Sequence, residues 1–207
     1  MTSRKPGCAR SLLLLVALLG GSLACNRSAH KEVRAVVDAP FPKKLSDWRL
    51  FVGSPAAQRP NRGVLPYDLN TPLFSDYAGK HRYVWMPAGA SARYRQEGVF
   101  DFPVGAILVK TFSFPADGRA TERLVETRLL VHAKDGWVGL PYVWDDEQND
   151  ATLQMVPDPV AVKWTDAAGK RHDFTYSIPN ANECHECHDN QRVMLPIGPR
   201  AANLNKT

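Results

Sequence analysis

The sequence predicts a mainly β protein, in which an antiparallel β-rich domain is followed by an incomplete α-type segment. Between residues 82 and 178, short runs rich in Val, Ile, Thr and aromatic residues are separated by stretches that contain turn-forming Gly and Asp. No helical pattern of apolar residues continues for ten residues or more in this region, so a doubly wound α/β sheet is not expected. From residue 181 onward the aromatic and β-branched pattern is lost, which marks the second segment.

Residues 1–24 predict a secretory signal of the lipoprotein type. Three basic residues and no acidic one lie in the first ten positions, and eight consecutive apolar residues fill positions 12–19. This run is shorter than the roughly 20 residues that a membrane span needs. Residues 22–25 (Ser-Leu-Ala-Cys) resemble a bacterial lipobox, which implies lipidation at Cys25; plain cleavage and a buried core helix are the alternatives. We expect export to the periplasmic side of a bacterial membrane, with attachment to that membrane through the lipid.

Periodicity and turn residues predict the elements that follow the signal. Residues 25–42 are polar and end in two prolines, which predicts a tether. Residues 43–52 predict a short helix with Leu45, Trp48 and Val52 on one face. The β-rich domain is expected over residues 43–180, with hairpin turns at Asp117-Gly118, Asp135-Gly136 and residues 166–169. The expected strands are residues 83–86, 92–95, 107–114, 124–133, 137–144, 160–164 and 173–178.

The composition excludes several classes of protein. Of 207 residues, 44% are hydrophobic and 23% are charged, unlike an intrinsically disordered chain, which is poor in apolar residues. A chain of this length forms an ordinary core without disulfides. The formal net charge is +5, but part of it lies in the signal, and no stripe rich in Lys and Arg remains. We therefore expect no nucleic-acid partner.

Two cysteines remain available for chemistry outside the signal and the lipid site. They lie in Cys184-His185-Glu186-Cys187-His188, which fits C-x-x-C-H, the attachment signature of c-type haem. The two thiols add to the two vinyl groups on one edge of the porphyrin, and His188 supplies an axial ligand for the iron. A chain of this composition contains the signature by chance about 0.002 times, so the match is specific. The sequence predicts one haem c.

Three other uses of the cysteine pair remain open. A redox disulfide is one, although the βαβ pattern that usually accompanies it is missing. A zinc site with Cys184, Cys187 and a His is another, although a structural zinc site needs four ligands and no second Cys pair is present. The third is a structural disulfide, which would close a very small ring.

Gly198-Pro199 follows the motif and adds a resemblance to class I cytochromes c. In that family a Gly-Pro element lies at a similar distance after C-x-x-C-H, and the Pro carbonyl accepts a hydrogen bond from the haem-binding His. The resemblance implies that the carbonyl of Pro199 orients His188. An ordinary Pro/Gly loop is the alternative.

Six longer stretches are also distinctive: residues 66–77, 102–105, 108–112, 126–130, 137–144 and 194–199. Together they resemble a family of exported bacterial haem-c proteins, which are catalogued as uncharacterised or as diheme cytochromes. The resemblance covers most of residues 43–204. Only 19 residues follow His188, which is too few for the helices that surround a porphyrin in a haem c domain. We therefore expect residues 181–207 to begin a haem c domain that is truncated; the alternative is that the β-rich part covers the haem. The single C-x-x-C-H motif does not support a second haem.

The second axial ligand of the iron is less well defined by the sequence. Met194 follows His188 closely and is the first candidate. An iron with an open coordination position is an alternative. Other candidates, each more typical of a core Met or a strand His, are Met86, Met155, His81, His132 and His172.

These observations favour an electron-transfer cytochrome that works outside the cytoplasm with a periplasmic or membrane redox partner. We expect an electron carrier rather than a catalyst, and no catalytic residue is predicted. Two alternatives stay open: a haem enzyme or sensor with an open iron site, and a lipid-anchored β-rich binding module whose Cys pair is structural or binds zinc.

Overall fold

The computed structural model describes residues 1, 2, 31–116, 122–156, 158–166 and 168–205. The predictions on residues 3–24, lipidation at Cys25 and the turn at Asp117-Gly118 lie outside these residues. Within the described part the protein is mainly β and its strands pair antiparallel, as the sequence predicts. No helix in this part is long and apolar enough to cross a membrane.

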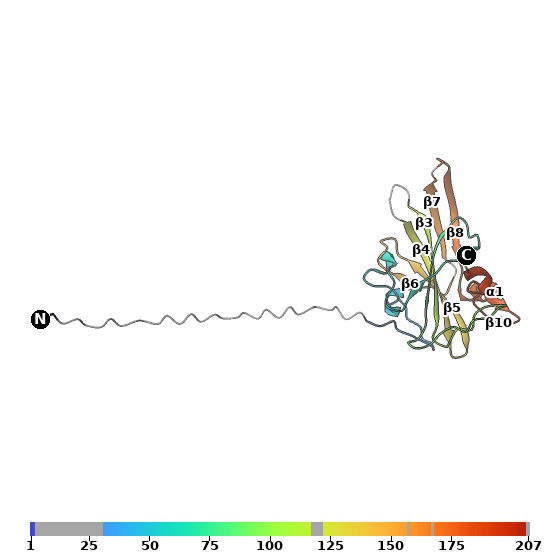
Figure 1. The fold of residues 1–207 in the computed structure, drawn as a ribbon. Helices are drawn as coiled ribbons and strands as arrows, with labels where there is room; N and C mark the ends of the chain where they lie inside the picture. Colours follow the sequence, from blue (N-terminus) through green and yellow to red (C-terminus); the bar gives the residue numbers. More distant parts are fainter. Residues whose placement is uncertain (3–30, 117–121, 157, 167, 206–207) are drawn as a thin grey trace.

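Six strands form the main sheet and follow one another in the order of the sequence (Figure 1). Each strand pairs antiparallel with the next, and the longer strands are runs of β-branched and aromatic residues. Their connections range from a short turn at residues 134–135 to the long segment of residues 86–106. The strands of this sheet are β1 (Leu65–Pro66), β2 (Gly79–Trp85), β3 (Ile107–Pro115), β4 (Glu122–Ala133), β5 (Gly136–Trp144) and β6 (Ala151–Leu153).

The remaining strands form two hairpins outside the main sheet. The first pairs β7 (Asp158–Thr165) with β8 (Arg171–Ile178), and it extends beyond the end of the main sheet (Figure 1). The second pairs β9 (Asp189–Asn190) with β10 (Val193–Met194), directly after the helix that carries the cysteines. The sequence did not predict this short hairpin.

Two of the predicted local structures differ from the observed ones. Residues 92–95 do not form a strand; Arg93 makes only one bridge to Asp101, which also binds the guanidinium of Arg95. Ala92 packs against the core, whereas Arg93, Tyr94 and Arg95 are exposed, so the stretch has no continuous apolar face with which to join a sheet. The expected helix over residues 43–52 is one turn of 3-10 helix, η1 (Leu45–Trp48), which ends because Arg49 is left-handed with φ 57°.

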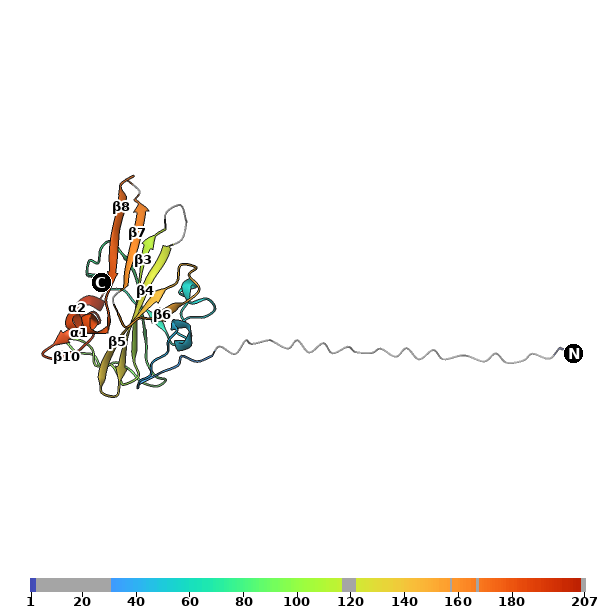
Figure 2. The same ribbon diagram turned by 180° about the vertical axis from the view of Figure 1, so that it is seen from behind.

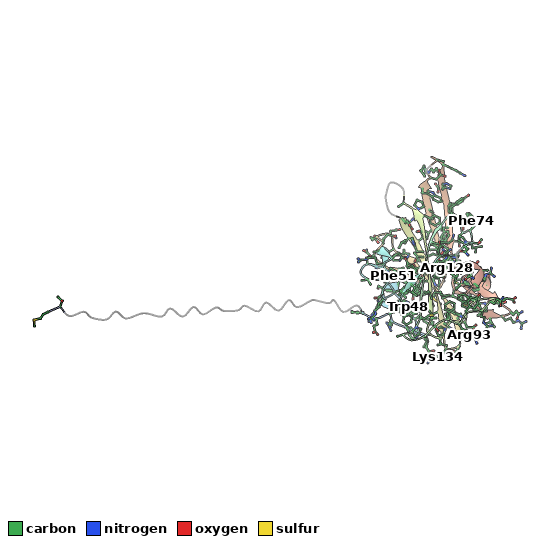
Figure 3. The ribbon with its side chains drawn as sticks, viewed as in Figure 1. Trp48, Phe51, Phe74, Arg93, Arg128 and Lys134 are labelled. Atoms are coloured by element: carbon green, nitrogen blue, oxygen red, sulfur yellow. The ribbon has the colours of Figure 1, made fainter. Side chains whose placement is uncertain are left out.

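One face of the main sheet buries the larger core. Alternation places Ile107, Leu129 and Leu140 on this face, where they pack with Trp48. The helices η1 and η2 (Pro55–Ala57) lie on this side in both views (Figures 1 and 2), and Figure 3 labels Trp48 and Phe51 there. The indole of Trp48 donates to the hydroxyl of Tyr142 over 2.6 Å, which secures the segment around η1 to the sheet.

The described part of the predicted tether belongs to the same side of the molecule. The backbone amide of Arg34 donates to the carbonyl of Trp48 over 2.9 Å, and Asn61 donates to the carbonyl of Lys31 over 2.9 Å. Val33 and Val36 pack against the larger core. Residues 31–42 therefore lie against the β-rich part.

The opposite face of the sheet carries the C-terminal segment (Figure 2). The segment contains α1 (Ala181–His188) and α2 (Ala201–Leu204). Cys184 and Met194 are buried in a cluster with Leu108 and Leu130 of the sheet, so the segment and the sheet share a core. Two short helices are all the α structure among the described residues, and the resemblance of this segment to cytochrome c stays a prediction.

Candidate functional site

The C-x-x-C-H motif lies entirely on α1, and the cap of this helix sets its orientation. The side chain of Asn180 accepts from the amides of Asn182 and Glu183 over 2.8 and 3.1 Å. The carboxylate of Glu183 accepts from the amide of Asn180 over 2.8 Å, which completes a capping box. The helix therefore begins at a defined residue, and the phase of Cys184, Cys187 and His188 around its axis is set.

Gly139 of β5 allows α1 to approach the sheet closely. A Cβ atom at this position would lie 2.9 Å from Cβ of Cys184 and 3.0 Å from Cε of Met194. Such distances are shorter than normal contacts, so any side chain would push the helix or Met194 away. The close approach leaves Cys184 4% exposed, whereas Cys187 is exposed.

His188 ends α1 and is held by the hairpin that follows it. Gln191 and Arg192 both have positive φ, at 54° and 68°, as in the tight turns that reverse a chain within two residues. The turn returns Leu195 to the helix end, where its amide donates to the carbonyl of His188 over 2.9 Å. The carbonyl oxygen of Leu195 lies 2.8 Å from Nδ1 of His188, which therefore donates its hydrogen. Nε2 is left with its lone pair free to bind a metal.

A cavity of about 880 Å³ opens beside the motif. Cys184, Cys187 and His188 line it from α1, and residues 196–200 continue the same wall. Residues 67–75 form another wall, and strands β2 to β5 contribute the floor. Asn70 joins this wall to the C-terminal segment, because its amide donates to the carbonyl of Asn203 over 2.8 Å.

Charged side chains lie on the floor of this cavity, whose walls combine apolar and polar residues. Lys110 and Arg128 line it, and Arg128 binds the fully buried carboxylate of Glu126 through two nitrogens. Burial, followed by the charges of Arg128 and Arg82, lowers the pKa of Lys110 to about 8. Burial also lowers the pKa of His188, and the charges of Lys110 and Arg128 add to this effect. Neutral His188 is therefore favoured.

The structure gives His188 a different partner from the one implied for Pro199. The carbonyl of Pro199 accepts from the amide of Phe100 over 3.1 Å, and the carbonyl of Leu195 is the one that holds the imidazole. Leu195 is closer in sequence, and the β9–β10 hairpin brings it back to the helix end. Pro199 still lines the cavity.

Met194 lies in the core rather than on the cavity wall. Its side chain is 7% exposed and packs against Gly139 and Cys184. Among the described residues that line the cavity, His188 is the only His and no Met is present. Met194 would have to leave its packed position to reach a metal bound in the cavity.

The other side chains considered for the iron are engaged elsewhere or exposed. Among the histidines, Nε2 of His81 lies 2.8 Å from Glu122, Nδ1 of His132 lies 2.9 Å from the carbonyl of Phe102, and Nε2 of His172 lies 2.9 Å from Asp166. Met86 packs against the cluster of Cys184, and Met155 is exposed.

A zinc site gains no support from the described residues. They hold no group of three or more His, Cys, Asp or Glu side chains that could bind a metal ion. The two cysteines are free thiols in this structure. Burial raises the pKa of Cys184, whereas the reactive thiol of a redox Cys-x-x-Cys motif has a lowered pKa.

Sequence reasoning missed Leu195, Lys110 and the wall of residues 67–75. Alternation along residues 107–114 places Lys110 on the same face of the strand as Leu108, but it does not reveal that this face lines a cavity.

Comparison with known proteins identifies no relative. No family model, no curated protein and no solved structure matches this chain.

Proposed function

We propose that this chain is a c-type cytochrome that carries single electrons outside the cytoplasm. Cys184 and Cys187 would hold one haem c, and His188 would bind its iron. The single observation that carries the proposal is the state of His188. Its Nδ1 is engaged by Leu195, its Nε2 is free, and its ring lines the same cavity as both cysteines.

The cavity suits a porphyrin in size and in polarity. Its volume of about 880 Å³ lies at the upper end of the usual range for cofactor sites. Leu73, Phe74 and Ile197 line it and are 73%, 67% and 51% exposed, which is unusual for large apolar side chains (Figure 3 labels Phe74). A flat apolar group bound beside α1 would cover them.

The residues of the chain have distinct tasks in this proposal. The thiols of Cys184 and Cys187 would each hold the haem through a thioether bond to one vinyl group, formed by addition of S–H across the double bond with no leaving group. The carbonyl of Leu195 keeps the hydrogen on Nδ1 and so keeps Nε2 available. The iron of a bound haem supplies one-electron redox chemistry.

Export and the lipid at Cys25 belong to the same proposal. Covalent haem is attached outside the cytoplasm in bacteria that make c-type cytochromes, and the N-terminal pattern predicts that this chain is sent there. A redox partner in the periplasm or in the membrane would then exchange electrons with the haem. The exposed position of Cys187 at the cavity wall gives such a partner access to this edge.

Visible spectra of the denatured, reduced protein test the proposal. The full chain is produced together with haem-attachment machinery, alongside a variant with Cys184→Ala and Cys187→Ala. His185→Ala serves as the matched control, because His185 is an exposed residue within the same motif. We expect haem bands in the parent and in the control and none in the double variant. Absence of haem from the parent, or its survival in the double variant, overturns the proposal.

Carbon monoxide separates electron transfer from the second candidate function, a sensor or enzyme with an open iron site. An unchanged spectrum of the native reduced protein indicates two protein ligands and electron transfer. A shifted band indicates an open position, which agrees with a cavity where His188 is the only His and no Met is present among the described residues.

A further inference from the structure

Three basic side chains lie side by side across adjacent strands on the cavity floor. In the register of the sheet, Lys110 of β3 pairs with Arg82 of β2 on one side and with Arg128 of β4 on the other. Directly paired residues point to the same face, and all three line the cavity. We call Arg82, Lys110 and Arg128 the cation row.

We propose that the cation row binds the propionate carboxylates of the haem, with Lys110 as the main contact. This inference rests on the proposed function and deepens it. In this proposal the floor of the cavity recognises the two carboxylates of the cofactor, and α1 would hold the cofactor through its vinyl groups.

The cation row carries more positive charge than its protein partners neutralise. Arg128 is bound by Glu126, and Arg82 lies 3.2 Å from Asp68, whose side chain is 65% exposed. Lys110 has no hydrogen bond or ion pair within the described residues; its ammonium group lies 4.6 Å from the centre of the Phe112 ring. A partly buried ammonium without a carboxylate is unfavourable, so an anion in the cavity would stabilise it.

The position of the cation row relative to α1 suits the two ends of a porphyrin. The thiols lie on α1, which packs on β5, whereas the cation row extends from β4 to β2. Three inter-strand spacings separate β5 from β2, which is about 14 Å. The vinyl groups and the propionates of haem are on different edges of the ring, so attachment at α1 leaves the carboxylates to be bound farther along the floor.

The floor and the walls of the cavity together explain why the recognised group is a carboxylate carried by an apolar molecule. Leu108 and Leu130 lie on the same face as Lys110, and both line the cavity. These two side chains are already buried, but Leu73, Phe74 and Ile197 on the cavity walls are exposed, and a small inorganic anion bound to Lys110 would leave them exposed. Haem supplies both an apolar face and two carboxylates.

The propionates of the holoprotein can be titrated by infrared difference spectroscopy. Intact-mass measurement first establishes that covalent haem is present. The variants are Lys110→Met, which removes the charge and keeps an apolar stem, and Lys110→Arg, which keeps the charge. Lys163→Met is the matched control, because Lys163 is a lysine of β7 that pairs with Asp173 and does not line the cavity.

We expect the proton affinity of one propionate to rise about tenfold in Lys110→Met and to stay at the parent value in Lys110→Arg and Lys163→Met. Equal propionate titration in Lys110→Met and Lys163→Met overturns the cation-row proposal while the cytochrome proposal stands. If Lys110→Met does not fold, the propionates are titrated in Arg82→Gln and in Lys110→Arg instead. A propionate titration of Arg82→Gln that equals that of the parent then overturns the proposal. Absence of covalent haem from the parent chain overturns both proposals and is recognised at the first step.

Discussion

Nδ1 of His188 lies 2.8 Å from the carbonyl oxygen of Leu195, seven residues farther along the chain. The β9–β10 hairpin makes this contact possible, because it reverses the chain directly after α1. The helix end, the turn and the imidazole therefore form one local unit. The orientation of His188 depends on residues close to it in sequence rather than on a distant element.

Replacing the two turn residues should stabilise this unit. Gln191 and Arg192 both have positive φ, a conformation that costs an L-residue roughly 1–2 kcal/mol and that Asn-Gly adopts readily. The pair of changes Gln191→Asn and Arg192→Gly should raise the free energy of unfolding by roughly 1 kcal/mol after the entropy cost of Gly. Urea unfolding of the haem-free protein measures it. Arg192→Ala is the control and should bring no gain; equal stability of all three proteins would contradict the assigned turn.

Adding one methyl group at Gly139 should displace α1. A Cβ there would lie 2.9 Å from Cβ of Cys184, so Gly139→Ala should cost about 1–3 kcal/mol of stability and reduce the yield of covalent haem. Val138→Ala on the same strand faces the larger core and is the control. It should lose similar stability without loss of haem per folded molecule. An unchanged haem yield in Gly139→Ala would show that this approach is not needed for attachment.

The buried carboxylate of Glu126 should be important for stability. It accepts from Arg128 of the same strand and from the hydroxyl of Tyr176 on β8, so it joins the main sheet to the β7–β8 hairpin. Glu126→Gln leaves Arg128 without its counter-charge and should cost about 3 kcal/mol in thermal or urea unfolding. Tyr176→Phe should cost roughly 1–2 kcal/mol. The exposed pair of Lys163 and Asp173 is the comparison, and Asp173→Asn should change stability by less than about 0.5 kcal/mol.

The lowered pKa of Lys110 predicts a pH dependence of stability in the haem-free protein. Its pKa is about 8 when folded and 10.5 ordinarily, so between these values the unfolded chain binds more protons than the folded one. Stability should therefore rise with pH from about 8 to 10.5 through this group. The difference between the parent and Lys110→Met isolates it, since other groups titrate in both proteins. If the difference in stability between the parent and Lys110→Met does not change between pH 8 and 10.5, the burial of Lys110 is contradicted.

Much of the main sheet could be predicted from local sequence. The runs of β-branched and aromatic residues at 107–114, 124–133 and 137–144 became β3, β4 and β5 with bounds that differ by at most two residues. Their side chains alternate between two buried faces, and this pattern is visible in the sequence. The strand expected at residues 92–95 does not form, because three of its four side chains are exposed and leave no continuous face to bury.

The site was predicted less completely, for physical reasons. Cys184, Cys187 and His188 form a motif in consecutive positions, so their shared place on α1 follows from local sequence. Leu195 depends on a turn formed by Gln191 and Arg192, residues that carry no usual turn signal. Lys110 joins the site only through the three-dimensional packing of α1 against the sheet, which no local pattern reports.

Intact-mass spectrometry of the denatured protein tests the central claim most directly. The chain is produced with its signal and with haem-attachment machinery, then purified and unfolded so that only covalent groups remain. The account predicts the mass of the processed polypeptide plus one haem, and loss of that increment in the variant with Cys184→Ala and Cys187→Ala. A polypeptide mass without haem, from cells in which another c-type cytochrome is matured normally, would contradict the account.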